Sequence, residues 1–432
     1  MLALAAFLPV ISAQDIVFEH ATVIDATGAP PRKDVTVAIA GGRILSIGLS
    51  VKAAPNTRVI DATGEFLIPG LWDMHVHLDP QGNELHTLVA NGITGIREMY
   101  TGIPIATLRE WRMRPENPRI AAAGFLDGPL LLTAGPPGPN AYAVGNADEA
   151  RLAVDLLAAG GADFLKVYNS LPRDAYFAIA QESKRLGIPF AGHVAEAVSP
   201  AEASEAGQRS QEHLINILLA CSTREEELRA QRISTMNDPA ISPVERALEL
   251  GFPNPKGLFD SYDDAKAAAL FKTFVKNATW QTPTLALLQS FLADRDRARR
   301  TLYMQDLSPE AFDMWMARIR ALLDRYKKLV GDMHRAGVEF LAGTDTSPNN
   351  PVPVGIGLHD ELELLVESGF TPMEALQTAT RNPARYFGTL KDVGTVEAGK
   401  LADMVLLNAN PLEDIRNTRK ISLVVLRGQI AK

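Results

Sequence analysis

The sequence predicts an α/β protein in which a (β/α)8 barrel carries a small β-domain formed by both termini. Two observations support this fold class. Short β-like runs dominate both ends of the chain, at 14–68 and 390–432. The region between them, 69–389, alternates eight apolar β-like runs with helix-like segments. Eight βα units in succession are what a closed parallel barrel requires.

The first 13 residues, "MLALAAFLPVISA", are almost wholly apolar. A membrane span needs about 20 residues, so we expect no span here. The segment is typical of the apolar core of a signal peptide, with Ser12 and Ala13 as its cleavage site, although a positively charged start is missing. A buried N-terminal strand is the alternative. If residues 1–13 are a signal peptide, we expect a periplasmic or secreted protein, and otherwise a cytoplasmic one.

The two ends of the remaining chain share one pattern. The first end contains "IVFEHATVID", "DVTVAIAGGRILSIG" and "RVIDATGEFLIPG", in which Val and Ile are frequent and Gly-Gly and Thr-Gly pairs mark turns. The last 40 residues, from "VGTVEAGK" onward, return to this pattern. Two β-rich ends around a different middle predict one small domain built from both.

The middle of the chain supplies the barrel. Helix-like segments, for example 147–160 and 173–186, separate most of its β-like runs. The first run is "LWDMHVHLDP" at 71–80, and the others are at 93–99, 118–124, 163–168, 188–193, 209–213, 279–285 and 338–345. Residues 125–146 are rich in Gly and Pro, so we expect an irregular loop there.

Two of the gaps between runs are too long for a single βα loop. Both are charged and helix-forming, which predicts helical insertions at about 222–275 and 288–335. They would lie above or beside the barrel, either as a lid or as plain surface excursions. Overall composition is ordinary for a globular chain of 432 residues, 46% hydrophobic and 22% charged. A net charge of -8 disfavours nucleic acid as a partner, and Cys221, the single cysteine, excludes an internal disulfide.

His75 and His77 end the first barrel run. Residues i and i+2 of a strand share a face, so these two side chains should project together. Neutral imidazoles are good zinc ligands, although two polar residues with ordinary hydrogen bonds are an alternative that the spacing leaves open. Lys166, His193 and His213 stand in or at the ends of later runs.

Asp345 ends the last run. A barrel brings the carboxyl ends of its strands to one face, and four of the eight histidines fall at such ends. Core packing does not explain this distribution, and the cluster therefore predicts a metal site.

These motifs resemble those of the amidohydrolase superfamily, in the branch of imidazolonepropionase-like proteins and metal-dependent Xaa-Pro dipeptidases. The similar stretches run from about residue 16 to the end of the chain and are "PGLWDMHVHL", "NGITGIREM", "DFLKVY", "FAGHV", "QEHL", "GTDTS" and "GTVEAGKLADMVLLNANPLEDIRNT". The resemblance implies a distorted TIM-like metal-dependent hydrolase barrel with a β-sandwich. Glu98, in "IREM", departs from the Asp that relatives more often have.

The resemblance also implies two divalent ions, expected to be zinc. The implied ligands are His75, His77, Lys166, His193, His213 and Asp345. The first two histidines would hold the more buried ion with Asp345, and the other two would hold the second ion. Lys166 would carry a carbamate derived from carbon dioxide and bridge both ions, since an ammonium group has no lone pair. An ion pair between Lys166 and a nearby acid is the alternative.

The implied chemistry is hydrolysis by a water that the ions activate. Asp345 would accept its proton and return one to the leaving nitrogen. Tyr168 shares a strand face with Lys166, so its hydroxyl would stabilise the oxyanion or hold substrate, unless it only packs at the rim. We expect a homo-oligomeric enzyme that cleaves an amide C–N bond in a small dipeptide-like, N-acyl amino acid or aromatic amide substrate. A substrate carboxylate would need a cation, such as an arginine on a βα loop.

Two other functions remain open. A mononuclear deaminase or ring-opening hydrolase would use Glu196, three residues after His193, to protonate a ring nitrogen, and Lys166 would then not be a ligand. A non-catalytic oligomeric scaffold is the second alternative. Scaffolds of this fold typically lose metal ligands, whereas this chain keeps the complete set.

Overall fold

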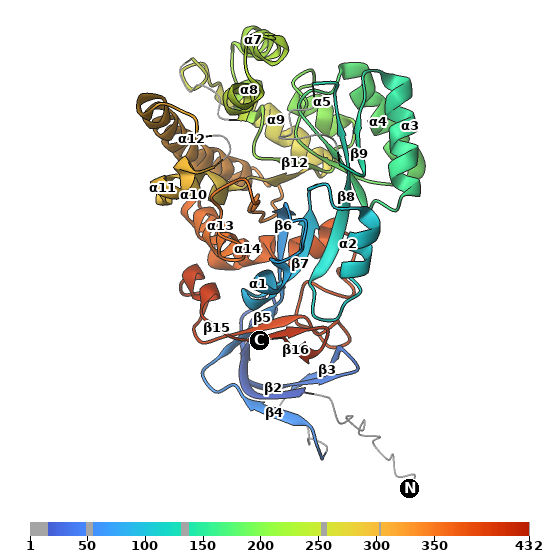
Figure 1. Ribbon diagram of the computed structural model, residues 1–432. Helices are drawn as coiled ribbons and strands as arrows, with labels where there is room; N and C mark the ends of the chain where they lie inside the picture. The colour runs from blue at the N-terminus through green and yellow to red at the C-terminus, as the bar shows by residue number, and fades with distance from the viewer. Residues whose placement is uncertain (1–15, 49–54, 131–137, 252–256, 302–303, 432) are drawn as a thin grey trace.

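The computed structural model describes residues 16–48, 55–130, 138–251, 257–301 and 304–431. A β-layer occupies one end of the molecule, parallel strands lie in the middle, and helices surround them (Figure 1). The predicted signal peptide at 1–13 lies outside the described residues. Among the helices that the structure describes, none is both long and apolar enough to cross a bilayer.

The β-layer is one sheet made by both ends of the chain. Its strand order is β16-β15-β14-β5-β1-β2-β3, and β4 pairs with β1. The C-terminal β14 runs antiparallel to β5, with Val405 opposite Ile68. Phe18, Val37 and Met404 are buried in its core. The strands are β1 (Ile16–Val23), β2 (Arg32–Ala40), β3 (Arg43–Gly48), β4 (Arg58–Asp61), β5 (Phe66–Pro69), β14 (Met404–Leu407), β15 (Ile421–Leu426) and β16 (Gln429–Ile430).

The second sheet is the barrel. Its order is β13-β12-β11-β10-β8-β7-β6, all neighbours being parallel, and the short β9 (Ala141–Ala143) pairs with β8. β9 lies inside the stretch 125–146, which is therefore not wholly irregular. The barrel strands are β6 (Leu71–Val76), β7 (Ile93–Glu98), β8 (Arg119–Asp127), β10 (Phe164–Val167), β11 (Phe190–Gly192), β12 (Ser210–Glu212) and β13 (Trp280–Thr282). The predicted fold class is confirmed.

The structure differs from the prediction at the eighth run, 338–345. This segment occupies the gap between β13 and β6 but makes only isolated bridges, at Phe340 and at Thr346. Its path is set by a buried carboxylate: the backbone N–H and hydroxyl of Thr344 donate to Asp73 at 3.0 and 2.7 Å. Asp345 then takes a φ of 59°. A left-handed residue interrupts a strand, so the barrel closes here without a regular ladder.

Local sequence explains where the surrounding helices begin and end. The Asn146 side chain accepts the N–H groups of the first turn of α3, and α4 ends at Gly187 with a φ of 70°. The helices are α1 (Leu85–Ala90), α2 (Ile105–Trp111), α3 (Ala147–Ala159), α4 (Arg173–Leu186), α5 (Pro200–Glu205), α6 (Ile217–Ala220), α7 (Glu225–Asn237), α8 (Pro243–Gly251), α9 (Asp264–Asn277), α10 (Leu285–Ala293), α11 (Arg295–Arg299), α12 (Pro309–Arg335), α13 (Ile356–Glu367), α14 (Pro372–Thr378) and α15 (Arg381–Tyr386).

The stretches predicted as insertions are helical. The stretch 222–275 contains α7, α8 and most of α9, and the stretch 288–335 contains most of α10 and the whole of α11 and α12. The helices α7 and α8 lie at the end of the molecule farthest from the terminal sheet (Figure 1). The exact domain boundaries stay a prediction.

Candidate functional site

The end of β6 brings two of the predicted ligands to Asp345. The Nε2 atoms of His75 and His77 lie 3.2 and 3.1 Å from the Asp345 Oδ1. One ligand atom from each of the three residues lies within 4.8 Å of the others. As the strand period predicts, the two rings are neighbours, with centroids 5.2 Å apart. Three convergent donors of these kinds could hold one divalent ion.

The other predicted ligands join the same cluster. The Lys166 Nζ lies 3.4 Å from the His75 Nε2, and the His213 ring lies 4.5 Å from that of His75 and 4.8 Å from that of His193, between centroids. Gly192 lets the Lys166 side chain pass close to the backbone of β11. A Cβ at Gly192 would lie 2.3 Å from the Val167 carbonyl oxygen and 3.0 Å from the Lys166 Cδ. The structure therefore brings all six predicted residues together.

Every histidine of the cluster is anchored through Nδ1. A ring held in this way keeps Nε2 as its ligand atom. The partners are Glu212 Oε2 for His75 at 3.0 Å, the Tyr100 carbonyl for His77 at 2.6 Å, Asn169 Oδ1 for His193 at 2.5 Å and Thr284 Oγ1 for His213 at 2.8 Å.

The protonation states suit metal ligands. Burial lowers the pKa of His75, and it lowers the pKa of His213 to about 3, so both rings are neutral at pH 7. Burial alone would raise the pKa of Asp345, but the neighbouring imidazoles outweigh it and hold that pKa well below its usual range. Burial lowers the pKa of Lys166 to about 8. An appreciable fraction of neutral amine, which a reaction with carbon dioxide needs, is therefore available near neutrality.

A buried ion pair behind the cluster was not predicted. The Arg97 Nη2 donates to both carboxylate oxygens of Glu212 at 2.8 Å, and both side chains are fully buried. Burial would raise the pKa of Glu212, but the Arg97 guanidinium, His75 and Lys166 together hold that pKa well below its usual range. The carboxylate therefore stays ionised and accepts the Nδ1–H of His75. Strand alternation places Glu212 and His213 on opposite faces. However, β12 ends at Glu212 and His213 has a φ of 60°, so both join the site.

Three further residues singled out in the sequence, Tyr168, Glu98 and Glu196, differ in how they lie relative to the cluster. The Tyr168 ring lies 4.0 Å from the His193 ring, between centroids, so it faces the site. Glu98 is buried, accepts the Thr101 hydroxyl at 2.7 Å, and has its pKa raised by burial. Glu196 is buried in a two-point ion pair with Arg232, with bonds of 2.8 and 2.7 Å.

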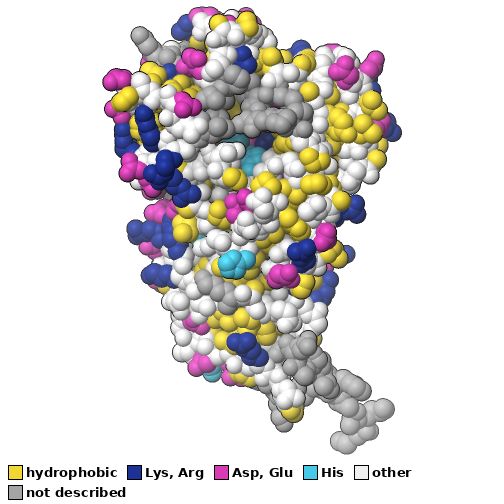
Figure 2. Space-filling view, viewed as in Figure 1, with side chains coloured by type: hydrophobic (Ala, Val, Ile, Leu, Met, Phe, Trp, Pro, Cys, Tyr) yellow, Lys and Arg dark blue, Asp and Glu magenta, His cyan; other side chains and the backbone are white. Residues whose placement is uncertain are grey.

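The cluster opens into a cavity of about 600 Å³, here called the catalytic cavity. The space-filling view shows histidine side chains inside a hollow in the upper half of one face (Figure 2). Glu196 is not among the described residues that line the cavity, and no arginine is among them either. These residues are His77, Leu78, Pro80, Met99, Tyr100, Thr101, Gly102, Phe125, Gly138, Lys166, Tyr168, His193, His213, Ile215, Leu248, Gly251, Leu287, Phe291, Asp345, Ser347, Pro348, Asn349 and Asn350.

One wall of the catalytic cavity is aromatic. Tyr100 stacks on Phe125 with ring centroids 4.6 Å apart, and Phe125 lies 5.4 Å from Tyr168, also between centroids.

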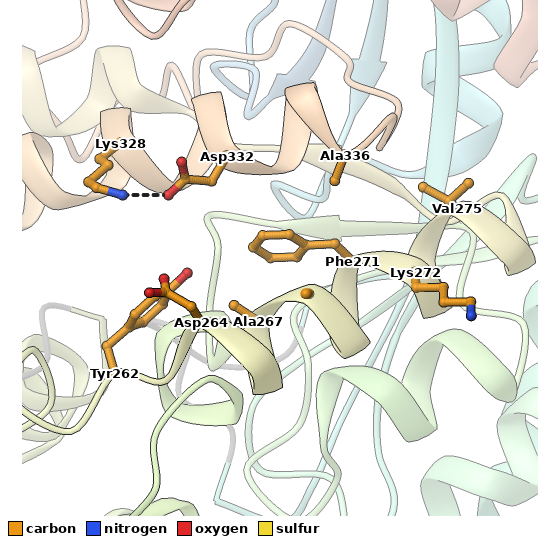
Figure 3. A pocket seen from close by; sticks show the side chains of 10 residues that line it. Tyr262, Asp264, Ala267, Phe271, Lys272, Val275, Lys328, Asp332 and Ala336 are labelled. Atoms are coloured by element: carbon orange, nitrogen blue, oxygen red, sulfur yellow. Dashed lines mark hydrogen bonds and ion pairs between the residues drawn. The ribbon is translucent and has the colours of Figure 1, made fainter.

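A second groove lies between α9 and α12 and is lined by other residues (Figure 3). That groove contains Phe271 and a Lys328–Asp332 pair but none of the predicted site residues.

Comparison with known proteins supports this picture. An ochratoxinase from Aspergillus niger is 29% identical over 194 residues, which are 44% of this chain and only 36% of that relative. Its crystal structure has a TM-score of 0.67 at 19% identity, over 97% of this chain and 96% of that chain. An N-acyl-D-aspartate deacylase from Alcaligenes xylosoxydans xylosoxydans is 38% identical over 97 residues, or 22% of this chain and 19% of the relative.

A Xaa-Pro dipeptidase with methionine bound in its active site has the same fold. Its TM-score is 0.70 at 19% identity, over 96% of this chain and 99% of that chain. The model of the amidohydrolase family matches residues 66–431. Because this match includes the complete barrel and the C-terminal strands, the protein belongs to the amidohydrolase family.

Proposed function

We propose that the protein hydrolyses the amide C–N bond of a small, largely apolar substrate. The observation that carries this proposal is the His75–His77–Asp345 cluster, whose donors converge beside a cavity with an aromatic wall. Relatives named as a deacylase and as a dipeptidase support amide cleavage. The matched stretches cover only part of the curated relatives. We therefore infer the substrate class from the residues that line the cavity.

We propose that the donor set holds two divalent ions, both zinc. Ions bound there would supply a water of lowered pKa and a polarised carbonyl. Neutral imidazoles, an ionised Asp345 and a carbamate on Lys166 would hold them. Asp345 is 17% exposed at its side chain, so it can reach the cavity. It would accept the proton of the attacking water and deliver one to the leaving nitrogen.

The cavity walls favour an uncharged aromatic amide over a free dipeptide. A buried dipeptide carboxylate needs a cationic partner. With Lys166 converted to a carbamate, the described lining offers no lysine or arginine cation. Tyr100, Phe125 and Tyr168 instead offer ring faces to an aromatic group. Tyr168, whose ring lies beside that of His193, would hold the substrate carbonyl. The deaminase alternative is disfavoured because Arg232 already binds the carboxylate of Glu196.

Metal content tests the centre directly. We expect two zinc ions per chain in protein purified from zinc-supplemented, bicarbonate-containing medium, and at most one in Lys166→Ala, because the bridging ligand is gone. Elemental analysis gives the ratio. Lys184→Ala, which removes an exposed lysine, is the matched control and should keep two ions. One ion per chain in wild type and in Lys166→Ala would reject the binuclear centre.

Turnover tests the proton transfer. Asp345→Asn should lower kcat for an N-aroyl amide at least ~100-fold, since general acid–base catalysis contributes about 10²–10⁴. Release of the amine from neutral aromatic amides and from free dipeptides is the assay. Wild-type rates in Asp345→Asn would exclude this residue as the proton carrier. Preference for free dipeptides would overturn the proposed substrate class.

A further inference from the structure

The helices α7 and α8, which belong to the first predicted insertion, reach the catalytic cavity. We call them the α7–α8 arm. Leu248 and Gly251, both on α8, are among the residues that line the catalytic cavity. Leu248 is only 2% exposed, so its side chain is packed into the protein rather than presented to solvent. The arm therefore forms part of the cavity wall and is not a plain surface excursion.

A buried ion pair ties the arm to the barrel. Arg232 of α7 donates through Nε and Nη2 to the two carboxylate oxygens of Glu196, at 2.8 and 2.7 Å. The Glu196 side chain is fully buried, and that of Arg232 is 13% exposed. The same Nη2 donates to the Leu250 carbonyl of α8 at 2.9 Å. One guanidinium thus joins both helices of the arm to one carboxylate of the barrel.

A second arginine of α7 supports this attachment. Arg229 lies three residues earlier, on the same helix face, and its Nη1 donates to the carbonyls of Glu196 and Val198 at 3.2 and 3.0 Å. The contact between Glu249 of α8 and Arg318 is more open, because the Glu249 side chain is 36% exposed, and exposed pairs contribute little. The polar attachment of the arm is therefore concentrated at the loop that contains Glu196.

This loop also supports the predicted metal cluster. Glu196 comes three residues after His193, and its N–H donates to the Asn169 carbonyl at 3.0 Å. The Asn169 Oδ1 in turn binds the His193 Nδ1 at 2.5 Å. The cavity wall supplied by the arm and one predicted ligand are therefore held by the same short segment.

We infer that Glu196 and Arg232 are positioning residues that hold the α7–α8 arm against the barrel, and that Leu248 on this arm limits the size of the apolar group that the site accepts. The inference rests on the proposed function, because that group belongs to the amide substrate. Neutralising the carboxylate leaves the Arg232 guanidinium buried without a counter-ion. Arg232 regains water only if α7 moves away, so the arm should loosen before the barrel does.

Hydrogen exchange of the metal-loaded protein tests the attachment without turnover. In Glu196→Gln, amides of α7 and α8 should exchange at least tenfold faster than in wild type, whereas β6 and β10 keep wild-type rates. Metal per chain should stay at the wild-type value, because no predicted ligand has changed. Arg224→Met is the matched control, since Arg224 is an exposed arginine of the same arm that pairs with Glu227; it should exchange as wild type does.

Leu248→Ala tests the wall while leaving the ion pair in place, and it serves also if Glu196→Gln fails to fold. Benzyl alcohol and 2-naphthalenemethanol, which the protein cannot hydrolyse, are titrated by NMR. The variant should improve binding of the larger probe about tenfold relative to the smaller one. Benzoyl and 2-naphthoyl amides of one amine should show the same change in relative kcat/KM, mainly through KM. Leu156→Ala, at an exposed leucine of α3, is the control.

Three results would overturn the inference. These are wild-type exchange of α7 and α8 in Glu196→Gln, an equal increase in exchange throughout the barrel, and a wild-type size preference in Leu248→Ala. Failure to hydrolyse either amide would reject the proposed function, while hydrogen exchange and probe binding would still decide the role of the arm. Amide hydrolysis with unchanged exchange and unchanged size preference would reject the role of the arm alone.

Discussion

Arg97 and Glu212 carry opposite charges in the most buried part of the site. Besides Glu212, Arg97 donates to the Met74 carbonyl at 2.6 Å and to the Ser210 hydroxyl at 2.8 Å. Glu212 in turn orients His75. The pair therefore fixes one predicted ligand through interactions that connect β6, β7 and β12.

Removing either partner should be costly. We expect Arg97→Met or Glu212→Gln to lower the free energy of unfolding by about 3–5 kcal/mol, because the remaining group is buried without its counter-ion. The double variant should cost less than the sum of the two. Thermal unfolding of the four proteins completes the cycle. Additive losses would show that the two groups do not interact in this way.

Left-handed backbone recurs among the site residues. The φ angles are 60° at His213, 59° at Asp345 and 87° at Tyr100. Such values cost on the order of 1–3 kcal/mol for residues other than glycine. Each of these residues comes after β-structure ends or breaks, so the turn brings a polar group to the cavity that strand alternation would not place there.

At the scale of elements, a side chain of α13 caps the N-terminus of α10. Thr284 precedes α10, but its hydroxyl binds the His213 Nδ1 and no side chain of its own caps the helix. Glu361 of α13 compensates, since its Oε2 accepts the Ala286 N–H at 2.7 Å. Burial raises the pKa of Glu361 to about 8. The helix that positions Thr284 thus depends on a carboxyl group buried between two helices.

This carboxyl group should make stability depend on pH. The folded pKa of Glu361 lies above the value of an unfolded glutamate, so the folded state holds its proton more tightly, and stability falls as pH rises from about 4.5 to 8. Glu361→Gln should reduce this fall by on the order of 1–4 kcal/mol. Denaturation at pH 5 and pH 8.5 measures it. Glu367→Gln, at a half-exposed position of the same helix, is the control and should lose as much stability between the two pH values as wild type does. An unchanged loss in Glu361→Gln would show that Glu361 is not the group responsible.

At the scale of the whole molecule, the terminal sheet and the barrel are tied together by polar contacts. The Arg119 Nε of β8 donates to the Asp403 carboxylate at 2.7 Å, and the Arg427 Nη2 donates to the Arg112 carbonyl at 2.6 Å. Both contacts join residues of the barrel half to the segment around β14 and β15. The C-terminal strands therefore support the barrel as well as completing their own sheet.

Metal removal should weaken the whole fold. Ions that bind only the folded chain stabilise it by about 2.7 kcal/mol at a free concentration of 100 Kd. We therefore expect a chelator to lower Tm and zinc to restore it, measured by differential scanning calorimetry. His77→Ala should respond less than wild type because it lacks one of the donors. An unchanged Tm in protein that has been shown to lose its metal to the chelator would contradict the link between metal binding and stability.

The sequence alone determined the fold class and the members of the cluster. Hydrophobic periodicity located seven of the barrel strands, and polar residues at strand ends singled out His75, His77, Lys166, His193, His213 and Asp345. Both are local patterns, which a linear chain displays directly. That these six residues bind metal stays a prediction.

Only the tertiary structure decided how the cluster is held and what surrounds it. Glu212 binds Arg97, which lies 115 positions away in the sequence. Arg232 binds the carboxylate of Glu196. Thr344 binds Asp73 where a regular eighth strand would otherwise lie. These choices depend on which distant side chains share a buried space, because a charge or polar group removed from water takes whichever partner the fold brings within hydrogen-bond distance.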